Sequence, residues 1–318
     1  MKMKKNILGV DIGGTKCAVI YGQKEGDTLH LVEKVKFPTT SVDETIANIC
    51  SEIEQMMGRH GLDSSNTGAI GISCGGPLDS KRGVVMSPPN LPGWNDIPIV
   101  RMLEERFGIR TGIHNDANAC ALAEWKFGAG VGTQNMVFLT FGTGLGAGLI
   151  LDGKLYAGTN DNAGELGHIR LSEFGPVGYG KCGSFEGFAS GGGIAQLARF
   201  KVSEKQQMGE SVAWCPPGQL DSISAHTVAL AAASGDPLAL EIYRISATYL
   251  GRGLAMVIDL LNPEVIVIGS IYVRNRELME PFVLQEIERE ALSHARRVCS
   301  VRPAKLGEQI GDYAALSV

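Results

Sequence analysis

The chain has 318 residues, more than the roughly 100 to 200 of a typical domain, which favours two domains. Hydrophobic residues make up 44% and charged residues 20% of it, so the chain can build a packed core and is not expected to be disordered. The 29 basic and 34 acidic residues leave a formal net charge of -5 without a Lys/Arg stripe, so we expect no nucleic-acid partner.

The sequence predicts neither a secretion signal nor a membrane partner. The basic start is followed by only a short apolar run, which stops at Asp11. The longest uncharged stretch, residues 127–151, could span a bilayer by length, but its many glycines and polar residues indicate strands and loops. The seven cysteines are never spaced as C-x-x-C, which argues against disulfides and a metal knuckle. We therefore expect a cytoplasmic protein with reduced thiols.

A glycine-rich hairpin is predicted in each half of the chain. Residues 7–10 and 17–21 form apolar strands around Asp11-Ile12-Gly13-Gly14-Thr15-Lys16. Residues 136–140 and 147–151 repeat the arrangement around Phe141-Gly142-Thr143-Gly144-Leu145-Gly146. The repetition indicates an internal duplication. Rossmann and Walker loops join a strand to a helix, so neither motif fits a loop between two strands.

Helices and buried strands alternate along the rest of the chain. Helical spacing is predicted for residues 42–57, 99–107, 117–127 and 237–261, and buried strands for residues 69–73 and 265–268. Asn115 or Asp116 supplies the start of the third of these helices. Strands that alternate with helices in both halves place the chain in the α/β class.

The paired hairpins suggest a nucleotide clamp. Facing one another across a cleft, they would offer backbone N–H groups and threonine hydroxyls to one polyphosphate. Asp11 follows an apolar strand, where its carboxylate would either bind water around Mg²⁺ or cap the turn. Lys16 could add a phosphate contact. For a single loop, a plain hairpin with an Asx turn remains the alternative.

Carboxylates in two further segments could bind a sugar and accept a proton from it. Asp116 lies at a strand-to-helix junction, where open α/β sheets hold ligands, and could accept a proton from a hydroxyl. The alternative is that Asn115 or Asp116 only caps the helix. Glu165 and Glu186 could pair on a polyol, with His168 beside them unless that histidine is structural. Residues 75–77 and 90–94 contain turn signals, which could equally be surface loops.

The ordered set of motifs closely resembles the ROK family of bacterial sugar kinases and sugar-responsive repressors. The motifs are Asp11-x-Gly-Gly-Thr-Lys, Gly75-Gly-Pro, the Asn90 to Trp94 turn, Asn115-Asp-Ala-Asn-Ala, Phe141-Gly-Thr-Gly-x-Gly, Gly164-Glu-x-Gly-His, Ala189-Ser-Gly and Val265-Ile-Val-Ile-Gly. The resemblance covers nearly the whole chain. It implies two ribonuclease-H-like lobes of the actin/hexokinase ATPase fold with an interlobe cleft, an N-terminal lobe of residues 1–117 and 302–318, and a C-terminal lobe of residues 118–301.

The resemblance also implies roles for individual residues. Asp116 would be the catalytic base. The implied sugar contacts are Gly75, Gly76, Asn90, Asn115, Glu165, His168 and Glu186. The implied nucleotide and phosphate contacts are Asp11 near Mg²⁺, Gly13, Gly14, Thr15, Lys16, Gly142, Thr143, Gly144 and, near the adenosine, Gly269. A homodimer is also implied.

The sequence departs from the family in two places. Where family members carry three zinc-binding cysteines, Val177, Tyr179 and Ser184 stand here, and Cys182 is out of register. One thiolate and one imidazole cannot complete a four-coordinate zinc site, so we expect no zinc. We expect the loop to be held instead by packing of Phe174, Tyr179, Phe185 and Phe188. The first hairpin begins at residue 7, so we do not expect the helix-turn-helix domain of the repressors.

The sequence therefore predicts an ATP- and Mg²⁺-dependent kinase that phosphorylates a hexose hydroxyl, glucokinase-like or N-acetylhexosamine kinase-like. A non-catalytic sugar-sensing regulatory protein of the same family is the main alternative. A filament-forming or chaperone-type ATPase is more distant, because it has no need of hydroxyl-binding carboxylates.

Overall fold

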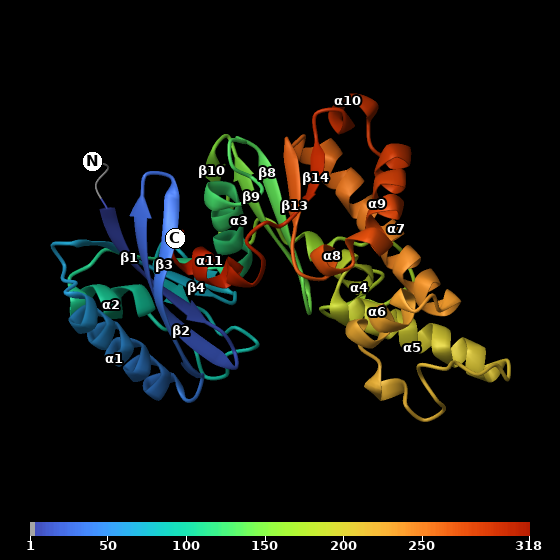
Figure 1. Cartoon of the computed structure of the whole chain (residues 1–318), viewed down its shortest axis with the longest axis horizontal. Helices are drawn as coiled ribbons and strands as arrows, with labels where there is room; N and C mark the ends of the chain where they lie inside the picture. The colour runs from blue at the N-terminus through green and yellow to red at the C-terminus, as the bar shows by residue number, and fades with distance from the viewer. Residues whose placement is uncertain (1–3) are drawn as a thin grey trace. The chain divides into compact units, whose positions relative to one another are not determined.

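A computed structural model describes residues 4–318 of the chain. Its first sheet has the strand order β3-β2-β1-β4-β7 (Figure 1). The strands are β1 (Lys4–Ile12), β2 (Lys16–Glu25), β3 (Thr28–Pro38), β4 (Thr67–Cys74) and β7 (Thr111–Asn115). The first three pair antiparallel, whereas β4 and β7 run parallel to β1. The carboxyl ends of β1, β4 and β7 therefore share one edge of the sheet.

Helices cover both faces of the first sheet. The covering helices are α1 (Val42–His60), α2 (Ile99–Phe107), α3 (Asp116–Phe127) and α11 (Ile310–Ala315). Alternation along β1 sends Leu8 and Val10 into a core shared with α1 and α2. Gly9 faces the opposite way, where a Cβ would lie 2.9 Å from the Cβ of Ala315 on α11. Two short strands, β5 (Leu78–Asp79) and β6 (Val84–Val85), and the 3₁₀ helix η3 (Gly307–Gln309) complete this part.

The second sheet has the order β10-β9-β8-β13-β14. Its strands are β8 (Met136–Phe141), β9 (Leu145–Leu151), β10 (Lys154–Leu155), β13 (Val265–Ile268) and β14 (Ser300–Pro303). β13 runs parallel to β8 and β14, and β10 runs antiparallel to β9. All four residues of β13 are fully buried, which explains their unbroken apolar sequence. In each sheet a glycine-rich hairpin adjoins parallel strands, which confirms the predicted duplication.

Most other helices belong to the second half of the chain. They are η1 (Leu166–His168), α4 (Phe185–Phe188), α5 (Gly191–Gln207), η2 (Leu220–Ser222), α6 (Ala225–Ala233), α7 (Pro237–Leu261), α8 (Ile271–Arg274), α9 (Arg276–Glu290) and α10 (Ser293–Arg296). A small hairpin, β11 (Val177–Gly178) with β12 (Lys181–Cys182), precedes α4. The fold is thus the α/β fold with two sheets that the sequence predicts.

Contacts divide the chain into two compact units. One comprises residues 1–134, 148–163 and 305–318, and the other comprises residues 135–147 and 164–304, so the boundary passes through β9. The C-terminal segment, residues 305–318, belongs to the first unit because α11 packs on β1. A division by contacts does not test the lobe boundaries expected from the sequence, 1–117 with 302–318 and 118–301, which stay a prediction.

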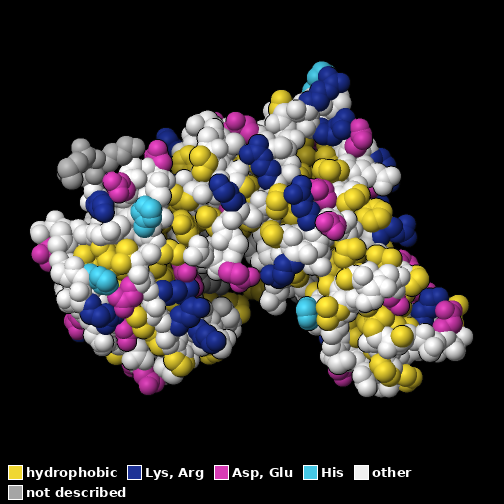
Figure 2. All heavy atoms as spheres, viewed as in Figure 1, with side chains coloured by type: hydrophobic (Ala, Val, Ile, Leu, Met, Phe, Trp, Pro, Cys, Tyr) yellow, Lys and Arg dark blue, Asp and Glu magenta, His cyan; other side chains and the backbone are white. Residues whose placement is uncertain are grey.

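The face drawn in Figure 2 carries charges of both signs, with groups of Lys and Arg side chains and scattered Asp and Glu side chains. That the chain binds no nucleic acid stays a prediction. Within residues 4–318, none of the helices combines the length and the apolar character needed to cross a bilayer.

Candidate functional site

The first glycine hairpin is closed by its own backbone. The N–H of Gly13 donates to the carbonyl of Lys16 at 3.1 Å, and the hydroxyl of Thr39 donates to the carbonyl of Gly13 at 2.6 Å. Gly14, Thr15 and Lys16 are exposed at the tip. A Cβ on Gly14 would lie 2.4 Å from the carbonyl oxygen of Asn90, so only glycine fits here. The predicted strand–turn–strand arrangement is confirmed, with its tip available to a ligand.

Asp11 lies at the end of β1 among charged groups of the same unit. Burial raises the pKa of its carboxyl to about 6, the nearby Lys34 ammonium opposes that rise, and the Asp312 and Asp116 carboxylates add to it. Lys34 forms an ion pair with Asp312 of α11. A Cβ on Gly311 would lie 3.5 Å from Asp11 Oδ2, so the C-terminal helix begins beside this carboxylate. A divalent cation would favour the ionised form of Asp11, and its oxygens suit Mg²⁺.

Asn115, not Asp116, caps α3. The Oδ1 of Asn115 accepts the N–H of Asn118 at 2.7 Å, whereas Asp116 Oδ1 accepts the adjacent N–H of Ala117 at 2.8 Å. The sequence left both residues open as caps, and the structure selects one. Asp116 is solvent-exposed, yet the protein packed around its carboxyl group partly dehydrates it and raises its pKa. An exposed carboxylate with a raised pKa is suited to accept a proton.

The two turns singled out in the sequence meet the same edge of the first sheet. Gly75 follows β4, and a Cβ on it would lie 3.1 Å from Asn90 Oδ1. A Cβ on Gly76 would lie 3.9 Å from the Cβ of Asn115. Trp94 is only 1% exposed and anchors the turn that carries Asn90. The backbone N–H of Trp94 donates to the carbonyl of Leu91 at 3.2 Å. The ends of β1, β4 and β7 therefore bring the candidate residues of this unit together.

The second glycine hairpin rests against the start of α5. The carbonyl of Gly142 accepts the N–H of Gly191 at 2.8 Å, and the carbonyl of Thr143 accepts the N–H of Gly192 at 3.2 Å. The hairpin is closed by a 3.1 Å bond from the N–H of Gly142 to the carbonyl of Gly144. Thr143 is exposed at the tip. Gly269, which follows β13, donates its N–H to Leu139 of the neighbouring strand at 2.9 Å.

Glu186 links this hairpin to the segment that carries Glu165 and His168. Its Oε2 accepts the N–H of Leu145 at 3.0 Å, and a Cβ on Gly167 would lie 3.3 Å from the Cβ of Glu186. Glu165 and His168 are exposed at the two ends of η1. The three candidate sugar residues of the second unit thus occupy one region beside Gly144.

The loop that lacks the zinc cysteines is held differently from our expectation. We expected the packing of Phe174, Tyr179, Phe185 and Phe188 to hold this loop. That prediction is wrong for Phe174 and Tyr179. Phe174 is 80% and Tyr179 is 79% exposed, whereas Phe185 and Phe188 are buried.

Hydrogen bonds hold the β11–β12 hairpin instead. The Gln196 side chain bonds both the N–H and the carbonyl of Val177, at 3.0 and 2.8 Å. Cys182 Sγ lies 3.2 Å from the carbonyl of Gly175, and Lys181 donates to the carbonyl of His168 at 2.8 Å. Across residues 4–318, no three His, Cys, Asp or Glu side chains gather as metal ligands. That the chain binds no zinc stays a prediction.

Two features near the candidate residues escaped sequence reasoning. Lys34 and Asp312 lie 278 positions apart, so no local pattern could pair them. Thr39 follows β3 and stabilises the first hairpin, although nothing in its neighbourhood resembles a turn motif.

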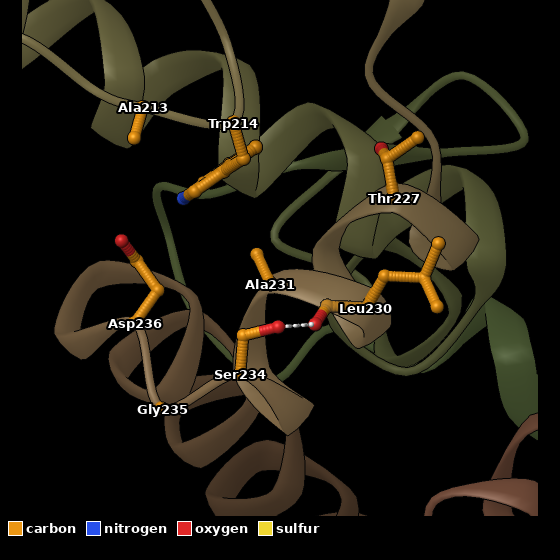
Figure 3. A pocket seen from close by; sticks show the side chains of 8 residues that line it. All are labelled: Ala213, Trp214, Thr227, Leu230, Ala231, Ser234, Gly235 and Asp236. Carbon is orange, nitrogen blue, oxygen red and sulfur yellow. Dashed lines mark hydrogen bonds between the residues drawn. The ribbon is translucent and has the colours of Figure 1, made fainter.

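A cavity of about 620 Å³ lies elsewhere in the second unit, between α6, the start of α7 and the segment around Trp214 (Figure 3). Its lining contains none of the candidate residues. The buried Trp214 Nε1 has no hydrogen-bond partner among the described residues. The side chain of Gln206 donates to the carbonyl of Cys215, the residue after Trp214, at 3.2 Å. Gln206 lies at the C-terminal end of α5, whereas the second hairpin contacts Gly191 at its N-terminal end. The length of α5 therefore separates the cavity from the second hairpin.

Comparisons with known proteins match most of the chain. The family model described as "ROK family" matches residues 7–317. A glucokinase of Streptomyces coelicolor is 33% identical over 96% of this chain and 94% of its own length. The crystal structure of a Streptomyces griseus ROK family glucokinase, in complex with glucose and AMPPNP, superposes with a TM-score of 0.73 at 31% identity, covering 98% of both chains. The DNA-binding transcriptional repressor Mlc of Escherichia coli is 29% identical over 82% of this chain but only 63% of its own length.

Proposed function

Because this chain belongs to the ROK family, we propose that it is an ATP-dependent hexose kinase, glucokinase-like or N-acetylhexosamine kinase-like. The placement of Asp116 carries the proposal. It directly follows the carboxyl end of β7, the edge strand of the first sheet, is exposed, and does not cap α3 because Asn115 performs that role. The glucokinases among its relatives support the same reaction class.

In this proposal Asp116 accepts the proton of a sugar hydroxyl while that oxygen attacks the γ-phosphorus of ATP. The bond between the γ-phosphorus and the bridging oxygen breaks, and ADP leaves. A sugar hydroxyl is a weak nucleophile at neutral pH, so a carboxylate that takes its proton during attack lowers the barrier. The raised pKa of Asp116 brings its proton affinity closer to what the step requires.

The sugar would be held by hydrogen bonds from both groups of candidate residues. The proposed contacts are Gly75, Gly76, Asn90, Asn115, Glu165, His168 and Glu186. Carboxylates and amide oxygens accept hydroxyl protons, and this set suits a neutral polyol better than an anion. Glu186 already uses one oxygen on the N–H of Leu145, which leaves its other oxygen for a ligand.

ATP would be bound through the glycine hairpins. The proposed contacts are Gly13, Gly14, Thr15, Lys16, Gly142, Thr143, Gly144 and Gly269. When bound, Mg²⁺ would neutralise phosphate charge, and Asp11 is the residue whose buried carboxylate fits its vicinity. The residues at both hairpin tips are exposed, and backbone N–H groups of such turns are suited to phosphate oxygens.

A sugar-sensing regulatory role is the second candidate, because the E. coli repressor Mlc is 29% identical to this chain over 82% of its length. A coupled assay of ADP release across a panel of hexoses and amino sugars separates the two. A kinase releases ADP only with its sugar, ATP and Mg²⁺ together. Calorimetric sugar binding without any sugar-dependent ADP release would instead identify a sensor.

A further inference from the structure

The cavity beside Trp214 contains a hydrogen-bond donor that the chain leaves unused (Figure 3). The indole Nε1 of Trp214 is buried and has no partner within residues 4–318. The hydroxyls of the lining are used, because Ser234 and Thr227 donate to backbone carbonyls of α6 and its cap residue at 3.0 and 2.9 Å. A buried N–H without an acceptor is costly, so an acceptor from outside the chain would stabilise this side chain.

Asp236 contributes an unused acceptor to the same cavity. Its Oδ1 accepts the N–H of Ala239 at 2.9 Å and so caps α7, whereas no hydrogen bond or ion pair within the described residues uses its Oδ2. Figure 3 shows the nitrogen edge of Trp214 and the carboxylate of Asp236 on the same side of the cavity. The cavity therefore offers both a donor and an acceptor to one ligand.

The charge and the walls of the cavity narrow the class of ligand. Asp236 is the one charged residue among the described residues of the lining, so phosphates and carboxylates would be repelled. A simple organic ammonium would satisfy Asp236 but not the indole N–H, which needs an acceptor. A hydroxyl both donates and accepts, so a polyhydroxylated ring satisfies both groups. Its C–H faces would pack on the indole, Leu230 and Ala231, and a volume of about 620 Å³ holds a molecule of that size.

We propose that this cavity is a second sugar-binding site, which takes an uncharged monosaccharide through Trp214 and Asp236. The site is separate from the candidate residues, because the length of α5 lies between the cavity and the second hairpin. Trp214 Nε1 is covered by protein atoms, so the indole ring must turn to bring its N–H to a sugar oxygen. Trp214 lies in a turn outside the helices and strands, where this rotation breaks no backbone ladder. Binding should therefore change the surroundings of the indole.

The test is ¹⁹F NMR of the full chain labelled with 5-fluorotryptophan, which gives one resonance for each of the three tryptophans. Trp214→Phe assigns the Trp214 resonance by its loss. Trp94 anchors the turn that carries Asn90, so its resonance reports on the candidate sugar contacts. In titrations with glucose, mannose and N-acetylglucosamine, at least one sugar should shift the Trp214 resonance with a dissociation constant different from that measured at Trp94.

Asp236→Asn separates ligand binding from helix capping. Asparagine caps a helix about as well as aspartate, so the melting temperature should stay at its wild-type value. The amide replaces the free carboxylate oxygen by a donor, so the sugar affinity measured at Trp214 should weaken about fivefold or more. The affinity measured at Trp94, and the Michaelis constant of sugar-dependent ADP release, should stay unchanged.

Asp221→Asn is the matched control. Asp221 is exposed on η2 in the same unit and lies outside the cavity lining. The same change of charge there should leave the sugar affinity measured at Trp214 unchanged.

An unmoved Trp214 resonance with all three sugars would overturn the proposal, as would an affinity in Asp236→Asn within twofold of wild type. A shift caused by adenosine or uridine where no sugar acts would overturn it in favour of a nucleobase site. Absence of sugar-dependent ADP release from the wild-type protein, with the Trp214 shift intact, would instead overturn the kinase assignment and leave this site standing.

Discussion

The neighbouring side chains of Asn115 and Asp116 divide two tasks that the sequence alone could not separate. Both residue types cap helices well, so their order along the chain does not reveal which one does so. The 2.7 Å bond from the Asn118 N–H to Asn115 settles the capping task. Substitutions at the two positions should therefore have opposite consequences for stability and turnover.

Asp116→Asn should abolish most turnover without unfolding the protein. The amide cannot accept the hydroxyl proton, and loss of a general base typically slows a reaction by 10² to 10⁴-fold, or about 3 to 5 kcal/mol of barrier. Its melting temperature at neutral pH should not fall below wild type, because Asn115 still caps α3 and the change removes a carboxyl whose pKa is raised by burial. Asn115→Ala is the control and should lose about 1 kcal/mol of stability. If Asp116→Asn keeps more than about a tenth of the wild-type rate at saturating substrates, Asp116 is not the base.

Glu165→Gln tests the sugar contacts of the second unit. The change preserves size but replaces an acceptor oxygen by a donor, so a sugar hydroxyl that donated there loses its partner at a cost of about 1 to 3 kcal/mol. The Michaelis constant for the sugar should rise while that for ATP stays nearly constant. Steady-state kinetics with each substrate varied in turn measures both. An unchanged Michaelis constant for the sugar would show that the segment around η1 is a structural turn without a sugar contact.

Asp11→Asn should stabilise the protein at pH 7 in the absence of Mg²⁺. The pKa of Asp11 is about 6 when folded, against 3.8 for an ordinary aspartate. The folded chain therefore binds more protons, so the Asp11 contribution to stability is full below pH 3.8 and falls as the pH rises to about 6. Removing that ionisation should gain about 2 kcal/mol at neutral pH, after allowance for solvent screening.

Denaturant unfolding of wild type and Asp11→Asn at pH 4, 5, 6 and 7, with EDTA present, measures this effect. The stability difference between the two proteins should grow with pH. A constant difference across this range would show that Asp11 ionises at its ordinary pKa.

Elements were predictable from the sequence where their signals are local. The helices expected at 99–107 and 237–261 and the strand at 265–268 agree with α2, α7 and β13. A Pro follows the cap residue Asp236 at the start of α7, and left-handed Gly108 ends α2. Local patterns did not predict α11, which has only six residues and is stabilised by packing on β1 and α3. Only the family resemblance implied a C-terminal helix packed on the first lobe.

The need for distant partners also explains why the packing prediction for the loop between η1 and α4 is only half correct. Buried Phe185 and Phe188 belong to or border α4, which packs on α7, whereas Phe174 and Tyr179 sit in turns on the surface. Local ring density could not tell a packed cluster from exposed turns. The polar bonds of Gln196, which lies on α5, required the tertiary structure.

The loop between η1 and α4 should be independent of zinc. Val177 and Ser184 offer no metal-ligating side chain of the kind that zinc prefers, and backbone bonds to Gln196 and Lys181 already hold the hairpin. Elemental analysis of protein purified without added metal should find far less than one zinc per chain. The melting temperature should not change with a strong chelator. Stoichiometric zinc that survives dialysis would contradict this account.

At the scale of the whole molecule, duplication explains why both sheets carry a glycine hairpin. The candidate residues near Asp11 and Asp116 come from the first unit, and those near Thr143 and Glu186 from the second. The sequence predicted both groups because each hairpin is a local motif. It could not predict how charges such as Lys34 and Asp312 pair across the first unit. The homodimer implied by the family stays a prediction that sedimentation equilibrium can test.

The most direct test of the proposed reaction is to observe its product. Purified protein is incubated with ATP, Mg²⁺ and the best sugar of the panel, and ³¹P NMR follows the phosphate resonances. The account predicts a phosphate monoester of the sugar that accumulates in step with ADP, together with loss of that signal in Asp116→Asn. Inorganic phosphate in place of the ester, or a sugar that binds while ATP remains intact, would contradict it.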